Sequence, residues 1–215
     1  MSGTAATGAA ISGATVTAKC KDGATYTATT NTAGKYTISG LPSSAFGCAL
    51  EITQGATVLH SYATGNGTVN ITPLTDMALT LAIGADPSAW FATFSTTTPT
   101  PNLAASKTAL LSELANKGFT IPSGDPFSTS FNADHTGWDS LLDNFQQALN
   151  SASQTYSTLL SSLQSGGTSG LNTSLPTAPP PASTYAISGM VSGADTALTW
   201  RLYRSEERRV GKECL

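Results

Sequence analysis

The hydrophobic pattern of the chain changes its period once, close to Thr72, and this change limits the folds that the chain can adopt. Before Thr72, apolar and polar residues alternate in short runs that Gly and Asn turns separate, which is the pattern of half-buried β-strands. After Thr72, apolar residues recur every three or four positions, as they do along one face of an α-helix. We therefore predict an α+β protein, with a β-sandwich of approximately seven strands over residues 1–72 and a small helical region over residues 73–164.

Two cysteines lie on the apolar faces of predicted strands. Cys20 ends the alternating run ATVTAKC, and Cys48 shares a face with Leu50 and Ile52 in FGCALEIT. Two sheets packed face to face could bring the two thiols within bonding distance, and closing a loop of this length stabilises a fold by about 3 kcal/mol. Buried free thiols are the alternative, because Cys is often buried when it is reduced. We predict a Cys20–Cys48 disulfide, which leaves Cys214 over.

A capping residue followed by a proline marks each of the first predicted helix starts. Thr72 precedes Pro73, the stretch GADPSAW repeats the arrangement, and Thr100 precedes Pro101. A Thr or Asp oxygen satisfies free N–H groups of a first helical turn, and Pro fits the first helical position. A later stripe at helical spacing begins at Trp138, so the sequence predicts several short helices in this region.

The helical pattern ends in a segment with the composition of a linker. Residues 165–184, SGGTSGLNTSLPTAPPPAST, are rich in Gly, Ser, Thr and Pro, which is typical of flexible or extended connections. Residues 185–203 return to alternation, but they provide only two strands. A two-stranded hairpin is marginally stable by itself, so we interpret residues 185–203 as the start of a truncated second β domain.

The last twelve residues differ in kind from the rest of the chain. Seven of the residues 204–215, RSEERRVGKECL, are charged, although the whole chain is only 11% charged. The segment resembles the translation of a sequencing-library adapter read in one frame. A natural tail of mixed charge is the alternative. We interpret residues 204–215 as an artefact and exclude them from functional reasoning.

The stretches TGAAISGATVTAK and TNTAGKYTISGLP resemble the carboxypeptidase regulatory-like domain, a transthyretin-like β-sandwich of exported bacterial proteins. Gly13 and Gly34 suit turns with positive φ, and Tyr36 suits a half-buried strand. The positions that carry the resemblance include Gly13, Ala14, Gly34, Tyr36, Gly40, Leu41 and Pro42.

The next stretch, NITPLTDMALTLAIGADPSAWF, resembles the region that follows this domain in a group of bacterial envelope lipoprotein candidates. The resemblance implies an exported protein of the periplasm or outer cell envelope. Family members usually carry a signal or lipoprotein segment before the first strand, whereas this sandwich begins almost at Met1. We therefore expect that the recorded start is internal and that the signal segment is missing.

Few residues of the chain suggest chemistry. Neither His60 nor His135 has a second His or Cys at ligand spacing, so we predict no metal site. Asp139 and Asp143 lie four apart and are interpreted as a solvated helix face. There is no Gly-x-Ser-x-Gly motif for a serine nucleophile. The zinc-carboxypeptidase domain that gives the family its name is absent, so the sequence predicts neither catalysis nor a cofactor.

The sparse charge also limits the partners. A net charge of −3 without basic clusters gives no attraction for nucleic acid, and no run approaches the roughly 20 apolar residues of a membrane helix. We predict a non-catalytic exported protein of the cell envelope that binds or presents an envelope protein or carbohydrate through its loops. Two alternatives remain: an accessory segment of a secreted, carboxypeptidase-like hydrolase whose catalytic domain is missing, and a structural spacer.

Overall fold

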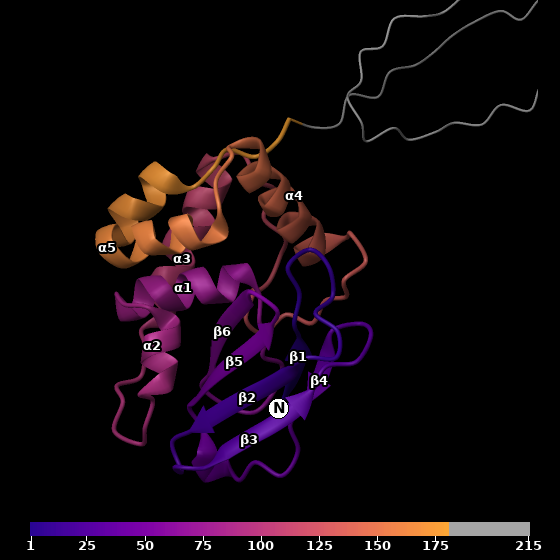
Figure 1. Ribbon diagram of the computed structural model, residues 1–215, viewed down its shortest axis with the longest axis vertical. Coiled ribbons are helices and arrows are strands. Elements are labelled where there is room, and N and C mark those ends of the chain that lie inside the picture. Colours follow the sequence, from indigo (N-terminus) through magenta and orange to yellow (C-terminus); the bar gives the residue numbers. More distant parts are fainter. Residues whose placement is uncertain (181–215) are drawn as a thin grey trace, which may run out of the picture. The chain divides into compact units, whose positions relative to one another are not determined.

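The strands precede the α-helices along the chain (Figure 1), so the predicted α+β class is confirmed. The computed structural model describes residues 1–180, which contain six strands in two sheets, one 3-10 helix and five α-helices. Their bounds are β1 Ser2–Thr4, β2 Thr15–Cys20, β3 Thr25–Thr29, β4 Lys35–Thr37, η1 Ser43–Ala45, β5 Cys48–Gln54, β6 Thr57–Ala63, α1 Pro73–Ile83, α2 Pro87–Ala92, α3 Leu103–Asn116, α4 Gly137–Ser151 and α5 Tyr156–Ser174. The end of the predicted linker (181–184), the predicted second β segment (185–203) and the charged tail (204–215) lie outside the described residues.

The strands form a larger and a smaller antiparallel sheet. The larger sheet has the order β3–β2–β5–β6, and the smaller sheet pairs β1 with β4. Residues 67–71 lie parallel to β1, where the Val69 N–H donates to the Ser2 carbonyl at 2.7 Å and the Ile71 N–H to the Thr4 carbonyl at 2.9 Å. The described part of the chain therefore has six strands and one extended segment where the sequence predicted approximately seven strands.

One apolar cluster is shared by the two sheets. Val16, Ala18 and Leu50 enter it from the larger sheet, and Tyr36 enters it from β4. These residues are the inward members of the alternating runs, because successive strand side chains point to opposite faces. Burial of this alternating set is the main stabilising contribution to the β region.

The predicted Cys20–Cys48 disulfide is present, but it does not cross between sheets as we expected. The S–S distance is 2.02 Å. β2 and β5 are neighbouring antiparallel strands, and their register places Cys20 directly opposite Cys48 with a Cα–Cα distance of 4.0 Å. The expectation of an inter-sheet bond was wrong. The alternation of apolar and polar residues shows that both cysteines point inward, but it does not show which strands are neighbours.

Two motif glycines adopt the left-handed backbone conformation, with φ of 69° at Gly13 and 71° at Gly34. A Cβ on Gly34 would lie 2.4 Å from the carbonyl oxygen of Ala5, whereas the space beside Gly13 is open. The buried Tyr36 hydroxyl donates to the Val69 carbonyl and so joins β4 to residues 67–71. Of the other motif residues, Ala14 is buried, Leu41 is half-buried, and Gly40 and Pro42 are exposed.

The outer face of the larger sheet is covered by α1 and α2. Ala49 of β5 and Tyr62 of β6 form a second cluster there with Leu79, Phe91 and Phe94. In Figure 1, α2 runs alongside β5 and β6, and α1 crosses between the sheet and the remaining helices. Residues 1–180 consequently form one compact unit, and Thr72 does not divide two independent domains.

A third apolar cluster joins α1 to α3, α4 and α5. Its largest contributors include Leu114, Trp138 and Phe145. The residues after β1 reach both this cluster and the β core: Ala5 packs among the sheet residues and Ala6 among the helix residues. Both alanines are fully buried, so the first residues of the chain connect the two cores.

The helix starts were predicted correctly in two places and incorrectly in a third. Thr72 and Asp86 accept hydrogen bonds from the first turns of α1 and α2, as predicted. α3 begins at Leu103 with Asn102 at the N-cap position, and Thr100 does not cap it. The Leu103 N–H bonds to the Pro101 carbonyl at 3.0 Å, so a turn separates Pro101 from the helix.

Part of the predicted linker is helical, and the prediction was wrong for residues 165–174. These residues form the second half of α5, which bends at Gly167, where φ is 52° and ψ is −130°. A Cβ on Gly170 would lie 2.0 Å from the Ser162 carbonyl oxygen. The small residues that resembled a linker instead allow the two halves of α5 to lie in contact, with Leu171 buried. None of the described helices combines the length and the apolarity needed to cross a bilayer.

Candidate ligand-binding site

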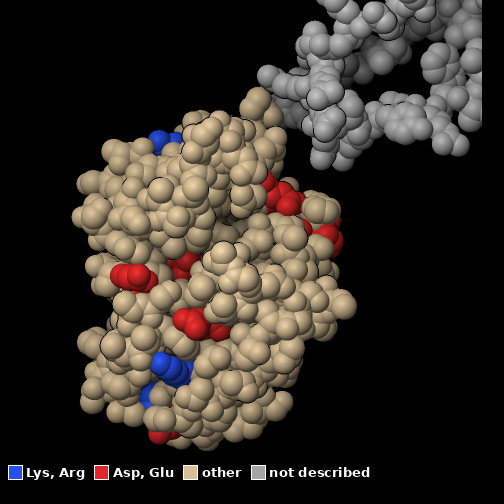
Figure 2. All heavy atoms as spheres, viewed as in Figure 1, with Lys and Arg blue, Asp and Glu red and all other residues tan. Residues whose placement is uncertain are grey.

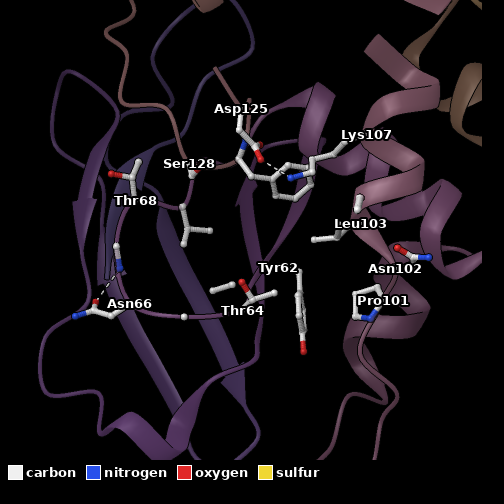
Figure 3. A pocket seen from close by; sticks show the side chains of 16 residues that line it. Tyr62, Thr64, Asn66, Thr68, Pro101, Asn102, Leu103, Lys107, Asp125 and Ser128 are labelled. Atoms are coloured by element: carbon white, nitrogen blue, oxygen red, sulfur yellow. Dashed lines mark hydrogen bonds and ion pairs between the residues drawn. The ribbon is translucent and has the colours of Figure 1, made fainter. Parts of the chain in front are cut away.

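A cavity of about 640 Å³ opens between the end of β6 and the start of α3. In Figure 3, Thr64, Asn66 and Thr68 lie on one side of it, and Asn102 and Leu103 lie on the other. Its volume is within the usual range for small-molecule sites, about 300–1,000 Å³. The lining consists of residues 62–69, residues 101–104, Lys107, Asp125, Phe127 and Ser128.

Uncharged polar groups line most of the opening. Thr64, Asn66, Asn102 and Ser128 are exposed to solvent there, and each supplies a hydroxyl or an amide that can form hydrogen bonds. The Asn66 Oδ1 already accepts the Gly67 N–H at 3.0 Å, so its amide NH₂ is the group left to donate. The Asn102 side chain makes no capping hydrogen bond to α3. The site therefore offers polar groups on both sides of the cavity, and none of these groups is charged.

Apolar side chains form the deeper part of the lining. Tyr62 and Phe127 are buried, and Leu103 is half-buried. The Tyr62 ring also packs edge-on against Trp90 with ring centroids 6.1 Å apart. A floor of this kind can contact the apolar face of a ligand while the rim binds its polar groups.

One ion pair closes the upper side of the cavity in Figure 3. The Lys107 ammonium bonds to the Asp125 carboxylate, and both side chains are partly exposed. The ammonium also lies 5.4 Å from the centroid of the Phe127 ring. Because the two charges neutralise each other, the lining carries no net charge that would favour an ionic ligand.

Asn70 holds the loop that carries Asp125 and Phe127. Its side-chain amide donates to the carbonyls of Pro126 at 3.0 Å and Thr129 at 2.8 Å, and its backbone N–H donates to the Phe127 carbonyl at 2.7 Å. Its Oδ1 accepts from the Thr4 N–H at 3.2 Å. This fully buried residue therefore fixes one wall of the cavity to β1.

A second polar cluster surrounds His60 beneath α1. His60 Nδ1 lies 2.8 Å from Asp76 Oδ1, and His60 Nε2 lies 3.2 Å from Glu51 Oε2. The Tyr156 hydroxyl donates to Asp76 Oδ2 at 2.8 Å. Burial by itself would lower the pKa of His60, but the hydrogen bonds and charges of Asp76 and Glu51 outweigh it and raise that pKa above 6.5. Burial and the charge of Asp76 raise the pKa of Tyr156.

The contacts of His60 include a serine, Ser88, whose Oγ lies 3.4 Å from His60 Nε2. Asp76, His60 and Ser88 thus have the connectivity of a hydrolase triad, in which the imidazole must offer a free lone pair to the serine. Glu51 is closer to the same nitrogen, and the raised pKa of His60 favours a proton on it. We interpret the cluster as a structural connection between β6, α1 and α5.

The predicted site residues and the cavity lie in different places. The two bonded cysteines and the motif glycines are absent from the lining. No binding role was predicted from the sequence for the turn of residues 64–68, for Asn102 or for Lys107. The missing information was the approach of α3 to this turn, which no local pattern in the sequence indicates.

Comparison of the chain with protein-family models, with curated proteins and with solved structures finds no match in any of the three. The interpretation of the cavity therefore depends on its own chemistry. Figure 2 shows one face of the molecule on which most of the surface is uncharged and basic side chains are few. This surface agrees with the neutral lining of the cavity.

Proposed function

We propose that the protein is a non-catalytic binding module of the cell envelope and that the cavity beside α3 holds a neutral, hydroxyl-rich ligand, namely an oligosaccharide. The observation that carries the proposal is the composition of this lining: hydroxyls and amides at the rim, apolar side chains below, and an ion pair that is internally neutral. Sugars present alternating hydroxyl groups and apolar ring faces, so they suit such a surface.

The geometry of the walls supports binding by a preformed site. Asn70 fixes the loop of residues 125–129, and helix α3 provides the opposite wall. A site held by regular elements and buried hydrogen bonds loses little conformational entropy when a ligand enters. This favours recognition over a spacer role, because a spacer has no use for a preformed cavity.

We also propose that the protein acts outside the cytoplasm, in the periplasm or the outer cell envelope. The Cys20–Cys48 disulfide supports this location, since disulfides persist mainly in oxidising compartments. The resemblance of residues 7–42 to carboxypeptidase regulatory-like domains supports it as well. On the same basis we propose that the two sheets are a transthyretin-like sandwich.

Binding of neutral oligosaccharides to the purified protein tests the ligand class. Isothermal titration with a panel of neutral, acidic and sulfated oligosaccharides is expected to give saturable binding with neutral members only. Asn66→Ala and Asn102→Ala are expected to weaken that binding by about tenfold each, as expected for the loss of about 1.4 kcal/mol of hydrogen bonding.

Asn116→Ala is the matched control, because Asn116 is an exposed asparagine at the other end of the same helix, α3. Its binding is expected to equal that of the unmodified protein. The proposal is wrong if no neutral oligosaccharide binds, or if both cavity variants bind as tightly as the Asn116 variant.

A further inference from the structure

A cluster of three residues that can bind a metal lies at the start of α4, outside the cavity lining. One donor atom from each of His135, Asp139 and Asp143 lies within 4.8 Å of the other two. His135 Nδ1 is 2.7 Å from Asp143 Oδ2, and Asp139 Oδ2 accepts a hydrogen bond from the backbone N–H of His135 at 2.7 Å. Figure 2 shows acidic side chains gathered beside α4 without a basic one next to them on that face.

The local backbone explains why these three residues meet. Asp139 and Asp143 lie four positions apart in α4, so they share one side of the helix. His135 precedes the helix with a φ of 63°, which is unusual for a residue other than Gly. This conformation places the His135 imidazole next to Asp143, so the cluster includes a loop residue and one face of the helix.

A segment from the other end of the chain borders the cluster. A Cβ on Gly8 would lie 2.6 Å from Asp143 Oδ1, and Gly8 has a φ of 103°. The loop after β1 can therefore approach the Asp143 carboxylate only because this position is Gly. On the opposite side, the His135 side chain is 81% exposed and the Asp143 side chain 34% exposed. The cluster thus has one side against protein and one side open to ions and water.

Asp139 gives a second reason, besides the spacing of the donor atoms, to expect a bound group here. The residue is fully buried, and its Oδ1 atom has no hydrogen-bond partner. Buried polar atoms are nearly always paired, because leaving a carboxylate oxygen without a partner costs free energy. The hydrogen bond between His135 and Asp143 does not account for this oxygen. A cation that the Asp139 carboxylate binds through Oδ1 would supply the missing partner.

We propose that His135, Asp139 and Asp143 bind a divalent transition-metal ion, with Zn²⁺ as the best match. One imidazole and two carboxylates suit Zn²⁺ and Mn²⁺, whereas Ca²⁺ takes six to eight oxygen ligands. At metal–ligand distances of about 2.0–2.2 Å, donor atoms on one ion lie about 3–4 Å apart, so the observed spacing requires little rearrangement. The open side leaves room for water as a further ligand.

Zinc binding to the chelator-treated full chain tests the inference. Isothermal titration with ZnCl₂ is expected to reveal a saturable site, and thermal unfolding is expected to shift upward with Zn²⁺, because a ligand of the folded state stabilises it by mass action. His135→Ala and Asp143→Asn are each expected to weaken Zn²⁺ binding by about tenfold or more, since each removes one of three protein ligands. CaCl₂ at the same concentrations is expected to cause no comparable shift.

Asp22→Asn is the matched control. Asp22 is an exposed carboxylate that accepts a hydrogen bond from the Tyr26 hydroxyl, and it lies far from α4 in the sequence. It is expected to bind Zn²⁺ like the unmodified chain. His135 is exposed, so its variant is expected to fold, which a circular dichroism spectrum identical to that of the unmodified chain would verify. The inference is overturned if the unmodified chain takes up no Zn²⁺, or if the His135 and Asp143 variants bind it as tightly as the Asp22 variant does.

Discussion

Asp76 holds His60 at two points: its Oδ1 accepts the backbone N–H of His60 at 3.1 Å and lies 2.8 Å from the imidazole Nδ1. His60 is 1% exposed and Asp76 is fully buried. The two residues belong to different elements, β6 and α1. The contact therefore joins the larger sheet to the first helix and is completed by Tyr156 from α5.

The stability of the protein is expected to fall as pH rises above neutrality. Asp76 and Glu51 raise the pKa of His60, so folding favours the protonated imidazole. The resulting stabilisation is fully present below the unfolded pKa of about 6.5 and is lost as pH rises through the higher folded value. Urea unfolding at a series of pH values from about 6 to 9 measures this loss.

The pKa of the second histidine, His135, is also raised, by its hydrogen bond to Asp143. Two variants separate the contribution of His60 to the pH dependence from that of His135. His60→Gln is expected to destabilise the fold by about 3–5 kcal/mol, because Asp76 is left buried without its charged partner, and to reduce the dependence on pH. His135→Asn is expected to retain the dependence that arises from His60. Equal pH profiles for the unmodified chain and the His60 variant would show that the buried pair does not titrate as described.

Removing the disulfide is expected to lower stability. Cys48→Ser is expected to cost about 3–4 kcal/mol under oxidising conditions, because the bond closes a loop with a sequence separation of 28 and restricts the unfolded chain. Thermal unfolding with and without a reductant measures the effect. The difference between the variant and the unmodified chain is expected to shrink when the reductant is present, and a constant difference would contradict this explanation.

Gly34 and Gly13 form a matched pair for testing the space beside β1. Both have a left-handed backbone, so Ala at either position is expected to cost about 1–2 kcal/mol in conformation. Only Gly34 would place a Cβ against the Ala5 carbonyl, so Gly34→Ala is expected to cost clearly more than Gly13→Ala. Chemical denaturation of the two variants measures the difference. Equal losses would mean that β1 can move away from Gly34 without penalty.

A second glycine pair tests the contact within α5. Gly170→Ala is expected to destabilise the protein, because the added methyl would meet the Ser162 carbonyl at 2.0 Å. Gly166→Ala has open space around it, and a gain of up to about 1 kcal/mol is expected from the better helix propensity of Ala. Denaturation midpoints of both variants provide the comparison. Two variants of equal stability would show that the halves of α5 are not in close contact.

The sequence predicted the strands and helices of the fold better than it predicted which of them lie next to each other. Alternation identified the inward faces of β2 and β5, and the capping residues Thr72 and Asp86 identified two helix starts, because these signals lie within a few residues of each other. The pairing of β2 with β5, which makes the disulfide a contact within one sheet, depends on chain segments far apart. The alternation of apolar and polar residues shows which side chains share a face and contains no information about this pairing.

The same limit applies to the sites. The acids at 139 and 143 were interpreted as a solvated surface because their helix position is all that the sequence provides. Asp139 is in fact fully buried, and Gly8 lies against Asp143. The cavity wall was missed for a similar reason, because Asn70 acts on residues more than fifty positions away.

The placement of Ala5 in one core and Ala6 in the other has a consequence for how the chain acquires its structure. During synthesis Ala5 and Ala6 leave the ribosome well before α4 and α5, whose residues share a cluster with Ala6 and lie more than a hundred positions further along the chain. The helical core can therefore close only after most of residues 1–180 have been translated, and a polypeptide released near Thr72 would present an uncovered, aggregation-prone surface to the cell.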